Sequence, residues 1–159
     1  MKGTFILSNK WDKRFLEMAQ LVSTWSKDAS SLVGCVAVRN RNVIAQGYYG
    51  FPRGMDDDPQ YYNDRPLKYR LIVHAEMNCI FNAAQNGVSL YGSTLYIYPL
   101  PACHECAKGI IQAGVVRVVS PVFENEFTQK RWEQSCTTTF EMFEEAGIQY
   151  DLVKGFTSV

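Results

Sequence analysis

The sequence predicts an α/β fold in which helices lie on both faces of a mixed sheet of five strands. After one early hairpin, apolar patterns typical of strands and helices alternate along the chain. Such alternation requires right-handed crossovers, which place helices on both faces of the sheet. The chain has 159 residues, of which 47% are apolar. A domain of this size buries roughly two-thirds of the surface that its unfolded chain exposes. We therefore expect a single domain over residues 1–159.

The first elements are an amphipathic helix and a hairpin. Residues 9–27 carry Phe15, Met18, Val22 and Trp25 at helical spacing, which predicts one apolar face. The runs "LVGCVAVR" and "VIAQGYY" are rich in β-branched and aromatic residues. The tripeptide "NRN" between them suits an antiparallel turn. These runs predict the first two strands.

A long segment without either period follows the hairpin. Residues 50–70 are dense in Pro, Gly, Asp and Tyr, which predicts a loop too long to be a mere connection, and therefore a functional loop or a lid. We interpret "DDDP" within it as a solvated turn and not as a calcium or magnesium site, because no ligand periodicity follows. A helix is then predicted over residues 74–86, closed by Gly87, and "TLYIY" predicts the third strand.

Helix and strand then alternate to the end of the chain. The stretch "CHECAKGIIQAG" predicts a helix ending at Gly114, and "VVRVVS" predicts a buried strand. Residues 126–146 predict a last helix, and "IQYDLV" predicts the fifth strand. The expected order is α-β-β-α-β-α-β-α-β.

Charge and hydropathy exclude several classes of protein. Sixteen acidic residues balance sixteen basic ones, which argues against a polyanion-binding tail and makes a nucleic-acid polymer an unlikely partner. No apolar run approaches the ~20 residues that a membrane span needs. The start "MKGTFILSNKWDKRF" lacks the pattern of a signal peptide. We expect a cytoplasmic protein. Five cysteines make a poor disulfide framework and leave room for metal binding or core packing.

Two short motifs suggest a metal centre. His74 and Glu76 fall at the start of one predicted helix, and Cys103 and Cys106 fall at the start of the next. One imidazole and two thiolates suit zinc, and three protein ligands leave the fourth tetrahedral position open for water. A metal lowers the pKa of such a water from ~15.7 to ~7. Helix N-termini should also lower the pKa of both thiols. Glu76 is free to move protons, so the pattern favours hydrolytic deamination.

A structural zinc site is the main alternative interpretation. It would need a fourth protein ligand, and His104, Cys79, Cys35 and Cys136 are the remaining His and Cys residues. Neighbouring helical residues point ~100° apart, which disfavours His104 as a partner of Cys103. We expect Cys35 and Cys79 to be core residues and His104 to face solvent or support a ligand.

Longer segments of the chain resemble one known family. His-x-Glu followed by Cys-x-x-Cys is the zinc deaminase signature. The stretches "SKDASSLVGCVAV", "GYYGFPRGMDD", "VHAEMNCI", "PACHECAKGIIQAG" and "FEEAGIQY" are together similar to the deoxycytidylate (dCMP) deaminase family, over residues 10–152. The resemblance implies a cytidine deaminase-like three-layer αβα sandwich with a five-stranded mixed sheet, usually assembled as a hexamer.

The resemblance also implies roles for individual residues. His74, Cys103 and Cys106 fall on the zinc ligands and Glu76 on the proton shuttle. Ala75 falls on the residue whose backbone amide contacts the pyrimidine 2-oxo group.

Phosphate candidates come from segments that match the family. Lys27 in "WSKD" and Arg53 in "FPRG" are the first candidates for binding a phosphate. Arg65, Lys68 and Arg70 are alternatives.

The chain departs from the family pattern at two positions. Ala102 precedes the first cysteine where the family usually has Pro, and we expect zinc binding to survive this change. Tyr49 replaces the Asn of a Gly-Tyr-Asn-Gly stretch linked to effector binding, so we expect a changed nucleotide contact or a changed response to dCTP and dTTP.

The expected reaction is zinc-dependent hydrolysis of dCMP to dUMP and ammonia by a homo-oligomer. One alternative is deamination of another cytosine or adenine compound, including 5-substituted dCMP and bases in RNA or DNA. A non-catalytic zinc-binding module is a further alternative, and the presence of Glu76 argues against it.

Overall fold

The computed structural model describes residues 3–7, 9–123 and 126–156. Twelve elements follow one another along this part of the chain: β1 (Thr4–Leu7), α1 (Lys10–Ser23), β2 (Gly34–Arg39), β3 (Asn42–Tyr48), α2 (Pro59–Asn63), α3 (Arg65–Leu71), α4 (Ala75–Gln85), β4 (Thr94–Tyr98), α5 (His104–Gln112), β5 (Arg117–Pro121), α6 (Glu126–Ala146) and β6 (Gln149–Lys154). None of the helices in these ranges is long and apolar enough to cross a membrane.

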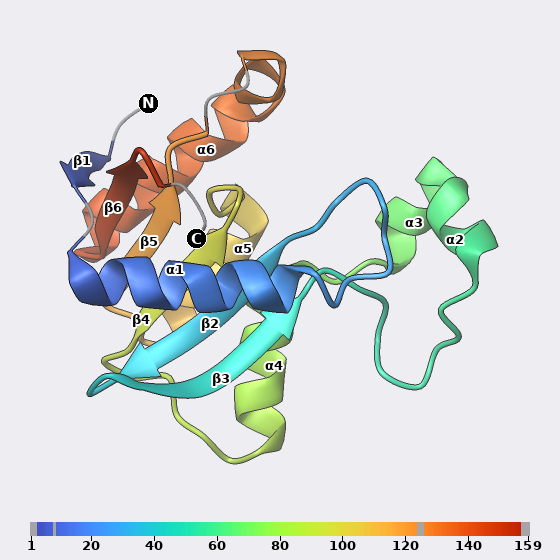
Figure 1. Cartoon of the computed structure of the whole chain (residues 1–159), viewed down its shortest axis with the longest axis horizontal. Coiled ribbons are helices and arrows are strands. Elements are labelled where there is room, and N and C mark those ends of the chain that lie inside the picture. The colour runs from blue at the N-terminus through green and yellow to red at the C-terminus, as the bar shows by residue number, and fades with distance from the viewer. Residues whose placement is uncertain (1–2, 8, 124–125, 157–159) are drawn as a thin grey trace.

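The strands form one mixed sheet in the order β1-β6-β5-β4-β2-β3 (Figure 1). The pairs β4–β5, β5–β6 and β6–β1 are parallel. Strand β2 pairs antiparallel with both β3 and β4. The predicted α/β class and the helix on each face are confirmed. The prediction of five strands was wrong by one, because β1 pairs with β6 at the sheet edge. This strand has only four residues, too few to show a period of two.

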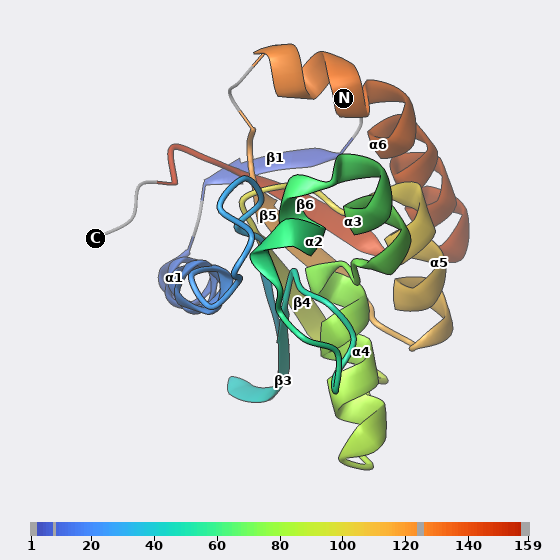
Figure 2. The same cartoon turned by 90° about the vertical axis from the view of Figure 1, so that its right-hand side faces the viewer.

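Helices cover the two faces of the sheet unequally. Helix α1 lies on one face, and α4, α5 and α6 lie on the other (Figure 2). Alternate residues of β2 serve the two sides, as a strand requires. Val36 and Val38 join the cluster under α1, whereas Cys35 and Ala37 join the larger cluster under α4, α5 and α6.

The apolar face predicted for α1 is confirmed for Phe15 and Val22, which are buried, and was wrong for Met18 and Trp25. Met18 is 42% exposed and Trp25 is 49% exposed. Trp25 lies beyond the end of the helix at Ser23, where its ring meets the edge of Tyr48. The buried residues sit instead at helical spacing one turn apart, and they include Phe15, Leu16, Ala19 and Val22.

The segment of residues 50–70, predicted to be a functional loop or a lid, contains two short helices, α2 and α3. Asp58 and Asp64 cap them, each accepting a hydrogen bond from a backbone N–H of the first turn. A proline occupies the first or second helical position of each helix, where its missing N–H costs no hydrogen bond. The sequence signal was therefore an Asp with a Pro one or two residues after it, which the interpretation of "DDDP" as a solvated turn overlooked.

Candidate active site

The starts of α4 and α5 meet on one face of the sheet. His74 is the N-cap residue of α4, and its side chain makes no capping hydrogen bond, which leaves the imidazole free to bind. Cys103 is the N-cap residue of α5, and its sulfur accepts a hydrogen bond from the Cys106 backbone N–H at 3.5 Å. The predicted convergence of the two helix starts is present in the structure.

A glycine in β3 allows α4 to come close enough to the sheet. A Cβ atom on Gly47 would lie 2.2 Å from the backbone nitrogen of Cys79 and 2.6 Å from the carbonyl oxygen of Ala75. Both atoms belong to the α4 backbone, so a side chain at this position would push the helix away. Gly47 therefore sets the depth at which α4 presents its first turn.

His74, Cys103 and Cys106 form a group whose ligand atoms all lie within 4.8 Å of one another. Each sulfur lies 3.5 Å from His74 Nδ1. Zinc bound tetrahedrally at ~2.3 Å from sulfur and ~2.0 Å from nitrogen implies a sulfur-to-nitrogen separation of about 3.5 Å. The three side chains therefore fit zinc without rearrangement. No fourth His, Cys, Asp or Glu of the described ranges joins the group, which leaves one tetrahedral position open.

The two thiols differ in acidity. Hydrogen bonds from Cys106 and His74 hold the pKa of Cys103 well below its ordinary value. The pKa of Cys106 is raised, because Cys103 hydrogen-bonds to it and it is buried. Helix position was expected to lower both pKa values, and only Cys103 behaves in this way. A second negative charge beside the first is unfavourable, so Cys106 needs a cation to lose its proton.

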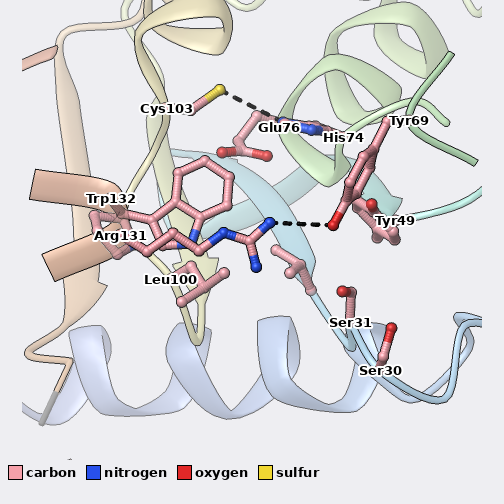
Figure 3. A pocket seen from close by; sticks show the side chains of 12 residues that line it. Ser30, Ser31, Tyr49, Tyr69, His74, Glu76, Leu100, Cys103, Arg131 and Trp132 are labelled. Carbon is pink, nitrogen blue, oxygen red and sulfur yellow. Dashed lines mark hydrogen bonds between the residues drawn. The ribbon is translucent and has the colours of Figure 1, made fainter. Parts of the chain in front are cut away.

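Glu76 lies beside this group and is 4% exposed. Burial raises the pKa of its carboxyl to about 7, and the nearby His74 opposes the shift. A carboxyl whose pKa lies near neutrality can both accept and donate a proton, which is the requirement for general acid and base catalysis. Its carboxylate reaches the same cavity as His74 and Cys103 (Figure 3).

The cavity has a volume of about 260 Å³ and lies between the metal-binding group and the start of α6. Its walls are mainly aromatic and apolar, with a few hydroxyl groups, a composition typical of small-molecule sites. Besides His74, Glu76 and Cys103, it is lined by Ser30, Ser31, Val33, Tyr49, Tyr69, Leu100, Pro101, Arg131 and Trp132.

Arg131 is the only lysine or arginine among the described residues that line the cavity. It extends from α6 across the mouth and donates a hydrogen bond to the Tyr69 hydroxyl at 3.1 Å (Figure 3). Sequence reasoning missed Arg131, Trp132 and Tyr69. The only signal was an Arg-Trp pair in the last helix, and nothing local indicates that this turn faces the metal ligands of two other helices.

The predicted phosphate contacts lie elsewhere. Lys27 forms an ion pair with Asp57, and Arg53 donates a hydrogen bond to Asn82 Oδ1 at 2.9 Å. Neither residue lines the cavity.

Lys68, an alternative candidate for the phosphate contact, is only 3% exposed. It forms an ion pair with Asp28 at 2.9 Å and donates a hydrogen bond to Ser30 Oγ at 3.1 Å. It therefore fixes one wall of the cavity.

Two further predicted contacts lie at or beside the metal group. Ala75 is fully buried at the first position of α4, where backbone N–H groups lack intrahelical partners. Tyr49 is buried against His74, with ring centroids 5.7 Å apart, and it lines the cavity. Burial raises the pKa of Tyr49 to about 12, so its hydroxyl is neutral and can donate a hydrogen bond.

The remaining His and Cys residues stand apart from the metal group. Cys35 and Cys79 are fully buried in the larger core cluster, as expected. His104 is exposed, with Nδ1 2.8 Å from Ser135 Oγ. Cys136 is buried in the same core cluster as Cys35. The structural-zinc alternative therefore gains no fourth ligand from the described residues.

Comparison with known proteins gives consistent matches. Residues 9–121 match the family described as "Cytidine and deoxycytidylate deaminase zinc-binding region". An uncharacterized deaminase of Aliivibrio fischeri is 36% identical over 141 residues, covering 89% of this chain and 92% of the relative. Deoxycytidylate deaminase of Mus musculus is 34% identical over 149 residues, covering 89% of this chain and 78% of the relative. The solved structure of a cyanophage dCMP deaminase with dCMP and dUMP has a similar fold, with a TM-score of 0.70 at 23% identity, covering 93% of this chain and 100% of that one.

Proposed function

The chain is a deaminase of the cytidine and deoxycytidylate deaminase family, and we propose that it hydrolyses dCMP to dUMP and ammonia with zinc as cofactor. The observation that carries this proposal is the cavity, which brings the metal-binding group, a buried carboxyl and one arginine together. The proposal treats residues 1–159 as one deaminase domain.

The reaction divides into roles for the chain's own residues. His74, Cys103 and Cys106 would hold zinc, and the bound metal would supply a Lewis acid that makes water nucleophilic enough to attack C4 of the cytosine ring. Glu76 takes one proton of the attacking water and delivers it to N3, and it then passes the second proton of that water to the leaving amine. The C4–N4 bond breaks, ammonia leaves, and the oxygen of water remains on C4.

The rest of the cavity orients the nucleotide. We assign the base to the aromatic space between Tyr49 and Trp132. By the resemblance to the family, we assign the 2-oxo group of the base to the backbone amide of Ala75. Arg131 is assigned to the phosphate, because it alone among the described residues brings a lysine or arginine side chain to this cavity. This assignment replaces Lys27 and Arg53 as the first candidates for the phosphate contact.

One substrate panel tests the proposal. Zinc-loaded protein is incubated with dCMP, dCTP, deoxycytidine and CMP, and the loss of cytosine absorbance is followed. We expect the largest kcat/KM for dCMP, and loss of activity with a strong chelator that added zinc restores. Equal kcat/KM values for dCMP and deoxycytidine would contradict a nucleotide-specific enzyme. No turnover of any compound would favour the non-catalytic alternative.

Two further proposals concern assembly and location. From the resemblance to the family we propose a homo-oligomer, with a hexamer as the expected state. Light scattering after gel filtration measures the number of chains in the assembly directly. We also propose a cytoplasmic location, where free nucleotides are available.

A further inference from the structure

Ala102, the residue before the first cysteine of the metal group, is held at both backbone polar groups by distant side chains. Its N–H donates to the Tyr150 hydroxyl at 3.2 Å, and its carbonyl accepts from Thr139 Oγ1 at 3.0 Å. Ala102 and Thr139 are fully buried, and Tyr150 is 5% exposed. The two hydrogen bonds join this position to β6 and α6, and both are shielded from water.

Tyr150 is itself fixed in place. Its hydroxyl lies 3.2 Å from Ser120 Oγ, and its ring packs on Phe140 and Phe143 with centroids 4.9 and 5.5 Å apart. A buried hydroxyl with two partners cannot change one bond without disturbing the other. Tyr150 therefore acts as a rigid anchor for the backbone that it contacts.

We propose that Tyr150 and Thr139 are positioning residues for the metal centre, because they fix the backbone from which Cys103 approaches His74. Where a proline precedes the first cysteine, its ring fixes φ and no N–H is present. Ala102 lacks that ring, and its N–H is the group that Tyr150 binds. Two side-chain hydrogen bonds thus supply the constraint that a proline ring would supply. This inference rests on the proposed function, because it concerns the zinc ligands.

Zinc affinity, measured by competition with a chromophoric chelator, is the decisive readout. Tyr150→Phe should weaken zinc binding about 10- to 100-fold, the range found when a group that supports a metal ligand is lost. Thr139→Val removes the second bond at almost constant shape and should weaken binding in the same direction. It also carries the test if Tyr150→Phe does not fold.

Tyr96→Phe is the matched control. Tyr96 is 4% exposed and donates to Asp12 at 2.8 Å on the opposite face of the same sheet. Loss of this buried hydroxyl should lower the free energy of unfolding and leave zinc affinity unchanged. If Tyr150→Phe and Thr139→Val likewise only destabilise the fold, the positioning role is refuted. If the unmodified protein binds no zinc, the proposed function fails instead.

A double-mutant cycle separates the direct bond from general softening of the core. Ala102→Pro removes the N–H but supplies a ring that fixes φ, so zinc binding should change little when Tyr150 is present. In the Tyr150→Phe background the same change should restore part of the lost zinc affinity, because the ring supplies the constraint that the hydrogen bond no longer gives. The two effects on zinc affinity are therefore expected to be strongly non-additive, and additive effects would overturn the inference.

Discussion

Replacing Arg131 by Gln should separate recognition of the phosphate from the chemistry at the base. Glutamine keeps the polarity and some of the length of arginine but removes its positive charge. The side chain reaches the mouth of the cavity, whereas Glu76 and His74 lie deeper beside the metal group (Figure 3). The change should therefore lower kcat/KM for dCMP and leave that for deoxycytidine close to its original value.

The size of the effect follows from the contacts of Arg131. Its present partner is the Tyr69 hydroxyl at 3.1 Å, and this exposed hydrogen bond is given up at little cost when a phosphate binds. A hydrogen bond to a charged group is worth about 1.5–3 kcal/mol, which corresponds to an about 10- to 150-fold loss of kcat/KM. Exposure of the guanidinium favours the lower half of this range.

Steady-state kinetics on dCMP and deoxycytidine decide the matter, with Lys27→Gln as the matched comparison. Lys27 is a cation of similar reach that is paired with Asp57 outside the cavity. If Lys27→Gln loses the preference for dCMP and Arg131→Gln keeps it, the assignment of the phosphate contact is wrong. Equal losses on both substrates by Arg131→Gln would instead indicate a structural role for the side chain.

Three other changes test the remaining parts of the site. Glu76→Gln should keep its zinc and its fold but lower the turnover rate about 10²–10⁴-fold, because an amide cannot carry the proton. Zinc content and deamination rate are measured, and a near-normal rate would assign the proton transfer to another group. Lys68→Met should cost about 3–5 kcal/mol of unfolding free energy by leaving Asp28 buried without its partner, and Lys68→Met/Asp28→Leu should recover much of it in denaturant unfolding. Burial opposes ionisation of Asp28, but hydrogen bonds from Lys68 and Ser30 lower its pKa below 3.8. The stability that Asp28 contributes should therefore be complete above about pH 4 and be lost as the pH falls through the lowered pKa. Asp28→Asn should flatten the dependence of the unfolding free energy on pH.

The metal-binding group was predictable because its signals are local. His74 and Glu76, and likewise Cys103 and Cys106, stand within three residues of each other at the start of a helix. In each pair, the same few residues both provide the candidate ligands and mark where the helix begins. Only the meeting of the two helix starts had to be inferred, and alternation of strand and helix on one sheet supports that inference.

The cavity walls were not predictable because they depend on tertiary placement. Arg131 and Tyr69 are 62 residues apart, and each looks like an ordinary surface residue within its own helix. Lys68 shows the opposite error, since a lysine in a polar segment is expected to be exposed, yet a carboxylate 40 residues earlier keeps it buried. The short strand β1 was not predicted for a related reason, because only its pairing with β6 marks these residues as a strand.

Tyr49 shows how far a resemblance between segments can be carried. Similarity to the family links its segment to effector binding, whereas the structure places its ring against His74 and its side chain in the wall of the cavity beside the metal-binding group. The backbone of the same segment is tied to the Ser26 hydroxyl, which donates to the Tyr49 carbonyl at 2.6 Å. In the position that we assign to the base, a bulky phenol would narrow the space directly, and it offers one polar atom where an asparagine offers two. On this assignment the substitution should act first on the substrate, and steady-state curves for dCMP with and without dCTP or dTTP test whether a response to the triphosphates accompanies it.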